Sequence, residues 1–321
     1  MDFSAIEDAW TRVKPWIVQT PLLKSDFLSE TYDSNVYLKL ECLQRTGSFK
    51  VRGAFNKVLL MDQDAMKRGI VTVSSGNHAV ALSYVGKKLD VKVTAVMPNT
   101  APRSKIELIK TYGADIVFHG ENYQEALELG LKISSETGAT FVHSYDDPDV
   151  IAGQGTVAVE LLKQLPNPEV VVIGVGGGAL FGGMAAYLKK ANPKISLVAV
   201  QPEKVATVDK SLQAGNPVKL STFEKTVADG LATGKIGNLV FDILRSSLSK
   251  FIPLNEHEIE QAILFLVKRE KIVAEGAGAA TVAALSHLRH EIAGRTTVCI
   301  ISGGNIDLDL LRHIISENSQ T

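Results

Sequence analysis

Short apolar runs alternate with longer amphipathic stretches along most of the chain. The run at Val170–Val175 carries no polar side chain, so both faces of a strand there would be buried. Such runs are typical of a parallel sheet that has helices on both sides. The pattern predicts strands at Val36–Glu41, Ile70–Val73, Val91–Met97, Asp115–Phe118, Phe141–His143, Glu169–Val175, Ile195–Gln201 and Thr297–Ile301.

Stretches with helical periodicity lie between most of these strands. Ser4 and Glu7 have the spacing of a capping box, and they predict a first helix that stops before Pro15. The stretch Pro202–Ile236 has no clear pattern and is interpreted as an excursion beside a site or as plain surface. The alternation of strands and helices predicts an α/β fold with parallel sheets. The other predicted helices are Arg52–Arg68, Asn77–Leu89, Arg103–Tyr112, Tyr123–Thr137, Val150–Leu165 and Leu180–Ala191.

Composition narrows the class of protein. The 321 residues carry 34 Lys and Arg against 35 Asp and Glu, and this near-neutral balance argues against a nucleic-acid or anionic-membrane partner. Two cysteines, Cys42 and Cys299, are too few for a disulfide framework and are interpreted as small core residues. The N-terminus has no signal-peptide pattern and no apolar run approaches the length of a membrane span, so we expect a cytoplasmic protein.

A glycine-rich segment follows the strand near residue 173. Four glycines fall within the five positions Gly174–Gly178, directly before a predicted helix, and together they favour a phosphate site over a simple tight turn. The segment also satisfies the G-x-G-x-x-G/A pattern of dinucleotide folds, with Ala179 at its last position. That alternative needs an acidic residue at the end of the next strand, where Gln201 stands, so it is weakened but stays open.

Three further segments carry polar chemistry next to predicted strand or helix ends. Lys50 lies between Phe49 and Val51 at the start of a helix, where burial would depress its pKa and favour a Schiff base, although a surface lysine is the simpler alternative. Ser74–His78 offers hydroxyls, an amide and helix N–H groups that suit a carboxylate. Ser302–Asn305 follows a strand at the edge where α/β folds bind ligands.

Taken together and in this order, these segments resemble the fold-type II pyridoxal phosphate enzymes, and most closely the serine/threonine dehydratase and serine racemase family. The resemblance implies a two-domain fold like that of the tryptophan synthase β subunit, with twisted, mostly parallel sheets flanked by helices. A large cofactor-binding domain would comprise residues 1–68 and 147–321, and a small substrate-gripping domain residues 69–146. The resemblance extends to Thr20–Leu22, Val150–Thr156, Ala228–Gly230 and Glu275–Gly278.

The resemblance also implies roles for individual residues. Lys50 would hold pyridoxal 5'-phosphate as a Schiff base and act as the base at Cα. Asn77 would bind the ring hydroxyl, Ser302 would face the ring nitrogen, and Ser75 is the candidate acid on the opposite face. The remaining cofactor contacts would come from Phe49, Gly176, Gly177, Gly178, Ala179 and Leu180, and the substrate would be held by Ser74, Ser75, Gly76, Asn77 and His78.

The expected activity is dehydration of a small β-hydroxy amino acid, such as L-threonine or L-serine, to a 2-keto acid and ammonia. The alternatives are a serine or aspartate racemase, a dehydratase for 3-hydroxyaspartate or phenylserine, and a non-catalytic sensor of a phosphorylated metabolite. Only Arg52 or Arg103 is placed to meet a second substrate carboxylate, which favours a neutral side chain.

Metal and assembly expectations also follow from the resemblance. Racemases of the family bind a divalent cation through two acids, and Gln201 and Thr207 stand at the matching positions, so no divalent metal site is expected. A monovalent cation remains an expectation, as does a homodimer or homotetramer. The chain stops at Thr321, so no feedback-regulatory domain is expected.

Overall fold

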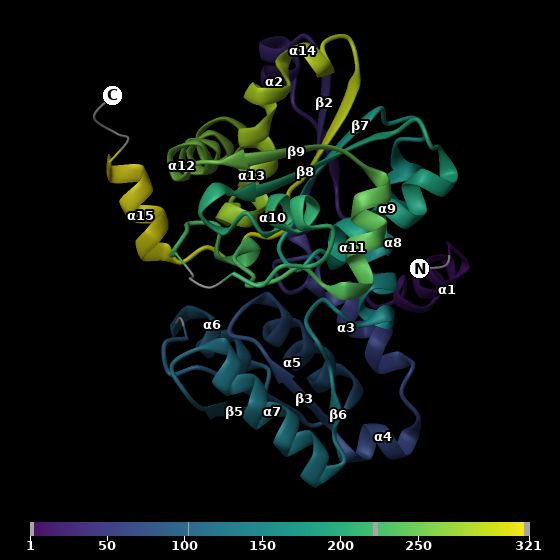
Figure 1. Cartoon of the computed structure of the whole chain (residues 1–321), viewed down its shortest axis with the longest axis vertical. Coiled ribbons are helices and arrows are strands. Elements are labelled where there is room, and N and C mark those ends of the chain that lie inside the picture. The colour runs from purple at the N-terminus through teal and green to yellow at the C-terminus, as the bar shows by residue number, and fades with distance from the viewer. Residues whose placement is uncertain (1–2, 102, 221–223, 318–321) are drawn as a thin grey trace.

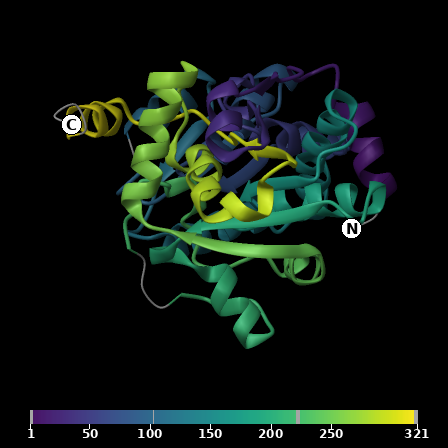
Figure 2. The ribbon, with the colours of Figure 1, turned by 90° about the horizontal axis from the view of Figure 1, so that it is seen from above.

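Two separate sheets, each flanked by helices, form the upper and lower parts of the molecule (Figure 1). The structure is a computed structural model that describes residues 3–101, 103–220 and 224–317. Helices α1 and α15 lie on opposite sides of it (Figures 1 and 2). None of the helices in these ranges is both long enough and apolar enough to cross a membrane.

The larger sheet has six strands, and all neighbouring pairs except one are parallel. The exception is the first strand, which pairs antiparallel with the second through Leu22 opposite Lys39. This arrangement confirms the predicted mostly parallel α/β class. In spatial order the strands are β1 (Leu22–Lys24), β2 (Asn35–Lys39), β10 (Thr296–Ile300), β7 (Val170–Gly174), β8 (Ser196–Pro202) and β9 (Leu248–Leu254).

The smaller sheet has four strands, all parallel, and they come from one continuous part of the chain. One of its two inner strands, β3 (Ile70–Val73), is buried at all four positions, as its apolar run predicted. In spatial order the strands are β5 (Asp115–Phe118), β4 (Val93–Met97), β3 (Ile70–Val73) and β6 (Thr140–Phe141).

Helices cover both faces of each sheet. Because side chains alternate along a strand, Val170 and Val172 of β7 pack with α12 and α13, whereas Val171 and Ile173 pack with α8, α9 and α11 on the opposite face. The helices are α1 (Phe3–Val13), α2 (Asp26–Tyr32), α3 (Lys50–Leu59), α4 (Gln63–Arg68), α5 (Asn77–Leu89), α6 (Arg103–Thr111), α7 (Tyr123–Thr137), α8 (Pro148–Gln164), α9 (Ala179–Ala191), α10 (Thr207–Ala214), α11 (Asn238–Ser247), α12 (Glu256–Phe265), α13 (Gly276–Ala283), α14 (Arg289–Ile292) and α15 (Leu308–Glu317).

Several boundaries differ from the predicted ones for local reasons. The helix predicted at 52–68 is two helices, because Asp62 caps a new one by accepting a hydrogen bond from the Ala65 amide at 2.7 Å. Helix α1 already includes Phe3, so it begins one residue before the predicted cap Ser4. The patternless stretch 202–236 contains α10. Cys42 and Cys299 are buried and free, as predicted.

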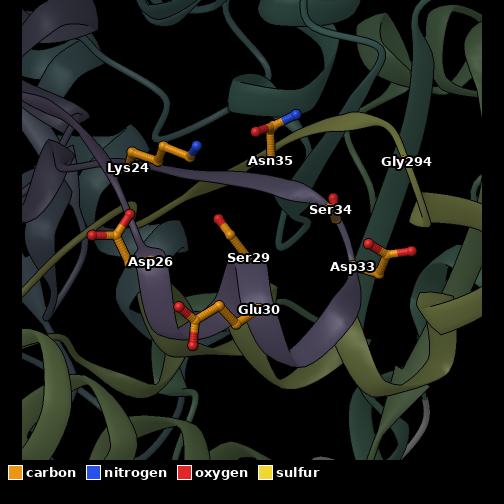
Figure 3. Close-up of a pocket in the computed structure, with 8 residues that line it drawn as sticks. All are labelled: Lys24, Asp26, Ser29, Glu30, Asp33, Ser34, Asn35 and Gly294. Carbon is orange, nitrogen blue, oxygen red and sulfur yellow. The ribbon is translucent and has the colours of Figure 1, made fainter.

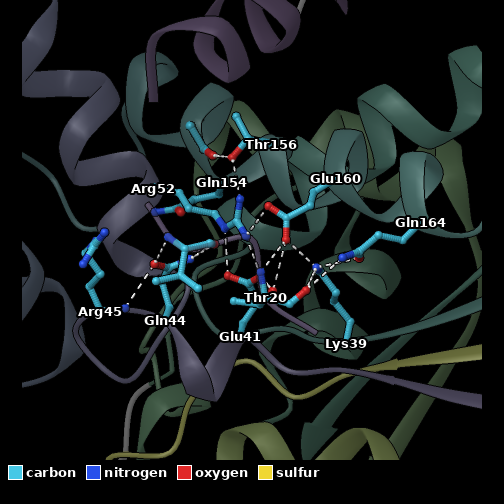
Figure 4. A network of polar contacts seen from close by, with 12 residues as sticks. Thr20, Lys39, Glu41, Gln44, Arg45, Arg52, Gln154, Thr156, Glu160 and Gln164 are labelled. Atoms are coloured by element: carbon cyan, nitrogen blue, oxygen red, sulfur yellow. Dashed lines mark hydrogen bonds and ion pairs between the residues drawn. The ribbon is translucent and has the colours of Figure 1, made fainter. Parts of the chain in front are cut away.

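A network of buried charges lies beneath α3 (Figure 4). The Arg52 guanidinium donates to Glu41 through Nη2 at 2.7 Å and Nε at 2.8 Å, and to Glu160 through Nη2 at 3.0 Å. Glu160 also accepts from the Lys39 ammonium, and the Thr20 hydroxyl donates to Glu41 at 2.6 Å. None of these side chains is more than marginally exposed to solvent, so each charge depends on its partners inside the protein.

We expect Glu160→Gln to lower the free energy of unfolding by about 3–5 kcal/mol, because it removes one charge of a buried set and leaves Lys39 without its ionic partner. Urea denaturation followed by circular dichroism measures the loss. The matched control is Glu136→Gln, an exposed glutamate that pairs only with Lys132, and it should change stability by less than about 0.5 kcal/mol. Equal effects of the two substitutions would contradict this interpretation of the network.

Candidate active site

The carboxyl ends of neighbouring strands bring the candidate segments together. Strands β2, β10 and β7 are parallel neighbours, so the segments that follow them meet at one edge of the sheet. The loop before α3 is held against the loop after β10: the Phe49 amide donates to the Ser302 carbonyl at 3.1 Å, and Ser48 bridges to Gly303. The residue that precedes Lys50 is therefore hydrogen-bonded to Ser302, which brings these two predicted segments together.

Lys50 is the first residue of α3 and its amine lies in a desolvated position. Its Nζ donates to the Ser144 carbonyl at 2.9 Å and lies 5.3 Å from the centre of the Phe49 ring. Burial lowers the pKa of Lys50 to about 8, and the charge of Glu275 opposes that shift only in part. A substantial fraction of the amine is therefore neutral near pH 8, which is the state that can attack a carbonyl.

The glycine segment after β7 forms a cradle that no side chain could share. A Cβ on Gly177 would lie 2.1 Å from Cγ of the Tyr145 ring, and one on Gly176 would lie 2.9 Å from the Gly230 carbonyl oxygen. Gly178 has φ of +96° and directly precedes the thirteen-residue helix α9. Closely approachable backbone at the N-terminus of a helix fits a phosphate group.

Hydrogen bonds on both sides fix the orientation of the Asn77 side chain at the start of α5. Its Nδ2 donates to Glu275 Oε1 at 2.6 Å, and its Oδ1 accepts from Asn305 Nδ2 at 2.8 Å. Asn305 also donates to the Thr46 carbonyl at 2.8 Å, which connects the loop before Lys50 to the same set. Asn77 therefore presents its amide to the site in one orientation.

Glu275 is a buried acid beside these groups. Burial raises the pKa of Glu275 to about 7, and the charge of Lys105 counteracts that effect. Among the residues that the structure describes, its Oε2 has no hydrogen-bond partner, although the atom is fully buried. Lys105 of α6 forms an ion pair at 2.6 Å with Asp229, which lies in the 3-10 turn Asp229–Leu231 between α10 and α11.

The segment between β3 and α5 has the open backbone expected of a carboxylate site. The Gly76 amide donates to the Ser74 hydroxyl at 3.1 Å, and a Cβ on Gly76 would lie 4.0 Å from Lys105 Nζ. Burial lowers the pKa of His78 to about 3, so its ring is neutral, and its Nε2 lies 3.4 Å from the Val142 carbonyl oxygen.

The cation that the structure brings to the site differs from the two arginines that the sequence suggested for a second substrate carboxylate. Arg52 is wrong for that role, because its guanidinium is fully buried and bound to Glu41 and Glu160. The Arg103 side chain lies outside the described residues. The cation that does reach the site is Lys105, which sequence reasoning missed.

Four other residues of the site could not be assigned a role from the sequence. Glu275 and Asp229 stand in segments that carried the family resemblance, but no chemical role followed from their positions alone. Tyr145 and Lys105 lie in helix or loop stretches of ordinary polarity, and only the fold brings them to the glycine segment and to α5.

Two cavities lie elsewhere on the surface. One, of about 430 Å³, opens between α2 and β2 and contains none of the candidate site residues (Figure 3). Its lining residues are Lys24, Asp26, Ser29, Glu30, Asp33, Ser34, Asn35 and Gly294. The other, of about 500 Å³, lies beside the C-terminal ends of α5 and α6. Neither contributes to the chemistry around Lys50.

The positions expected to have lost metal ligands are occupied by a hydrogen-bonded pair. Gln201 Nε2 donates to Thr207 Oγ1 at 2.9 Å, and Gln201 Oε1 accepts from the Val208 amide at 3.1 Å. Both ends of the amide are therefore engaged within the protein. Across the part of the chain that the structure describes, no group of three or more His, Cys, Asp or Glu side chains is placed to hold a metal ion.

A buried lysine amine at the Ser144 carbonyl, beside a glycine segment that packs against Tyr145, fits the class of pyridoxal phosphate enzymes. The family model described as pyridoxal-phosphate dependent enzyme matches residues 13–303, and the chain belongs to that family. The chain is 41% identical over 312 residues to an L-threonine ammonia-lyase of Thermotoga maritima, a match that covers 97% of this chain and 77% of the relative.

Solved structures of related enzymes have the same fold. The processed form of threonine deaminase isoform 2 from Solanum lycopersicum is 32% identical, with a TM-score of 0.93 that covers 98% of this chain and 93% of that one. Maize serine racemase is 30% identical, with a TM-score of 0.93 that covers 99% of this chain and 98% of that one. The fold is thus the predicted fold-type II architecture, an α/β fold in which mostly parallel sheets are flanked by helices.

The pKa of Lys50 predicts how the protein without cofactor reacts with added pyridoxal phosphate. Only the neutral amine reacts, so the rate of covalent attachment should rise about tenfold per pH unit up to about pH 8 and then level off. Stopped-flow absorbance over a pH series measures this rate, and borohydride trapping with peptide mass mapping shows which lysine reacts. A midpoint near the ordinary lysine value of 10.5, or attachment elsewhere, would contradict the assignment.

Proposed function

We infer that this protein is a pyridoxal phosphate-dependent ammonia-lyase that converts L-threonine or L-serine into a 2-keto acid and ammonia. The observation that carries this inference is the position of Lys50, whose partly neutral amine donates to the Ser144 carbonyl, next to the Tyr145 ring that packs on the glycine cradle. The identity with the Thermotoga maritima L-threonine ammonia-lyase supports the choice of substrate.

The residues present fit the cofactor. We propose that the backbone amides of Gly176, Gly177 and Gly178, extended by those of Ala179 and Leu180 in the first turn of α9, hold its phosphate. When bound, pyridoxal phosphate supplies a conjugated ring that accepts the electron pair left when a Cα proton departs.

The rest of the cofactor would be held by side chains around Lys50. We propose that Asn77 donates to the ring hydroxyl, that Phe49 packs beside the ring, and that the Ser302 hydroxyl faces the ring nitrogen. Ser302 is neutral and almost fully buried, so it cannot fix a proton on that nitrogen as a carboxylate would. A weaker electron sink of this kind favours early departure of the β-hydroxyl.

The substrate carboxylate would lie at the N-terminus of α5. We propose that the Ser74 and Ser75 hydroxyls and the amides of Gly76, Asn77 and His78 hold it, since free N–H groups and the positive end of the helix dipole stabilise an anion. The neutral His78 ring adds no charge there. This placement leaves Cα near Lys50 Nζ.

The chemistry that follows balances without an external oxidant or reductant. Lys50 Nζ takes the Cα proton, the Cα–H electron pair forms the Cα–Cβ double bond, and the β-hydroxyl leaves with a proton as water. Hydrolysis of the resulting enamine then returns that water and releases ammonia. The net products are one 2-keto acid and one ammonia per amino acid.

The charge balance of the site favours a substrate with a neutral side chain. Lys105 is the cation that reaches Gly76, but Asp229 already neutralises it at 2.6 Å. A second substrate carboxylate would have to compete with Asp229 and would approach the buried acid Glu275. We therefore propose that 3-hydroxyaspartate is a poorer substrate than L-threonine.

Serine racemisation is the second candidate, because the maize serine racemase has the same fold over nearly the whole chain. It requires a proton donor on the face opposite Lys50, for which Ser75 is the candidate. The hydrogen-bonded pair of Gln201 and Thr207 replaces the acids expected of a racemase cation site. Elimination therefore remains the preferred reaction.

We further propose the division of the chain into a small domain, residues 69–146, and a large one formed by the rest. All four strands of the smaller sheet lie within 70–141, which supports that boundary. A homodimer or homotetramer and a bound monovalent cation are also proposed, by the resemblance to the family.

Lys50→Ala should reduce keto-acid formation from L-threonine by at least about a thousandfold, because both cofactor attachment and removal of the Cα proton use this amine. The measurement is a coupled keto-acid assay, with circular dichroism to show that the fold is retained. Lys67→Ala, which removes an exposed lysine paired only with Asp64, is the control and should leave the rate unchanged. A Lys50→Ala enzyme with a tenth of normal activity would refute the central assignment.

The reaction products distinguish the two candidate activities. We expect L-serine to give mainly keto acid and ammonia, with D-serine as a minor product, and we expect a divalent-ion chelator to change the rate less than about twofold. Chiral chromatography beside the keto-acid assay measures both quantities in one reaction. Faster formation of D-serine than keto acid, or loss of activity on chelation, would favour the racemase.

A further inference from the structure

The segment that leads from β6 to α8 runs along one wall of the site. The Ser144 carbonyl accepts the hydrogen bond from Lys50 Nζ, and the Tyr145 ring packs directly against Gly177. Within the segment, the amides of Tyr145 and Asp146 donate to His143 Nδ1 at 3.3 and 2.9 Å, which fixes its turn. Asp146 therefore belongs to the same turn as the Tyr145 ring that packs on the cradle.

Asp146 binds the N-terminus of α11, a helix that lies about 90 residues further along the chain. Its Oδ1 accepts from the Leu239 amide at 2.9 Å, and its Oδ2 accepts from both the amide and the side-chain Nδ2 of Asn238, each at 3.1 Å. A carboxylate that meets free helix N–H groups gains charge-assisted hydrogen bonds and a favourable interaction with the helix dipole. Asp146 thus anchors this end of α11.

The same end of α11 contacts the glycine cradle. The Gly237 amide donates to the Gly177 carbonyl at 2.9 Å, and a Cβ on Gly178 would lie 2.7 Å from Val240 Cγ1. In a trans peptide the carbonyl and the following N–H point in opposite directions. The bond to the Gly177 oxygen therefore also fixes the direction of the Gly178 N–H, one of the donors in the cradle.

We propose that Asp146 is a positioning residue for the cofactor phosphate: it holds α11 in place, and through the Gly237–Gly177 hydrogen bond it sets the orientation of the cradle amides relative to Lys50. The proposal rests on the assignment of Gly176–Gly178 to the phosphate. It assigns to Asp146 no contact with substrate or cofactor. Asp146 acts on the phosphate end alone, since the contacts to the ring come from other residues.

Cofactor affinity with and without the phosphate tests this directly. Asp146→Asn keeps the size of the side chain but removes its charge and turns one acceptor into a donor that faces N–H groups. We expect its dissociation constant for pyridoxal 5'-phosphate to rise about tenfold, while that for pyridoxal, which lacks the phosphate, changes less than about twofold. Equilibrium titration of the cofactor-free protein by absorbance measures both constants.

Asp242→Asn is the matched control, because Asp242 lies on the same helix, is 81% exposed and pairs only with Arg245. It should leave both constants unchanged. If Asp146→Asn raises the dissociation constants for pyridoxal 5'-phosphate and pyridoxal equally, or raises neither, the positioning role is overturned. Thermal unfolding of each variant shows that the protein being titrated is folded.

Gly178→Ala separates this proposal from the assignment on which it rests. Alanine is strained at φ of +96° and its Cβ would meet Val240, so the substitution distorts the cradle itself. Selective loss of pyridoxal phosphate binding in Gly178→Ala but not in Asp146→Asn would sink the positioning role and keep the cradle. If Gly178→Ala also binds both ligands normally, the phosphate assignment fails, and the proposal with it.

Discussion

The buried charges beneath α3 are the interaction on which the geometry of the site depends. Arg52 lies two residues after Lys50, and its guanidinium joins Glu41, which follows β2, to Glu160 of α8. Charges withdrawn from water tolerate little misalignment, because each lost hydrogen bond leaves an uncompensated buried group. An apolar set of equal volume would hold these elements together about as strongly, so the charges contribute mainly a defined orientation of α3. That orientation places the Lys50 amine at the sheet edge where the glycine cradle lies.

A second balance of charges keeps the amine of Lys50 reactive. Glu275 would hold Lys50 protonated if it were fully ionised, but its own burial raises its pKa to about 7 and so weakens that effect near neutral pH. Lys105 stabilises the ionised form of Glu275, while Asp229 neutralises Lys105. A change in the charge of Glu275 therefore alters the neutral fraction of the Lys50 amine. Burial keeps the pKa of Lys50 low only while the negative charge around the amine stays small.

Much of the fold and the centre of the site follow from local sequence. Strands β3 and β5 and helices α5 and α7 begin and end where the pattern of apolar and polar residues predicts. The glycine and hydroxyl segments were found because they directly follow strands, and Lys50 was found because it stands between apolar residues at the start of a helix. Strand β9 was missed, since its burial does not alternate and it contains Pro253. Lys105 and Asp146 could not be assigned, because they reach their partners Asp229 and Asn238 only through the tertiary fold.

Three of the contacts that join the regions of the two sheets at the site are polar. Lys50 binds the Ser144 carbonyl, Asn77 binds Glu275, and Lys105 binds Asp229, and each pair joins a residue from the region of the smaller sheet to one associated with the larger. A shift of one sheet away from the other would have to break all three together. A substrate carboxylate at the N-terminus of α5 adds a negative charge beside Lys105 and thereby competes with Asp229 for it. Substrate binding and the separation of the sheets are therefore coupled through Lys105 and its neighbours Asp229 and Glu275. Because the charge of Glu275 also affects the pKa of Lys50, recognition and reactivity depend on the same few side chains.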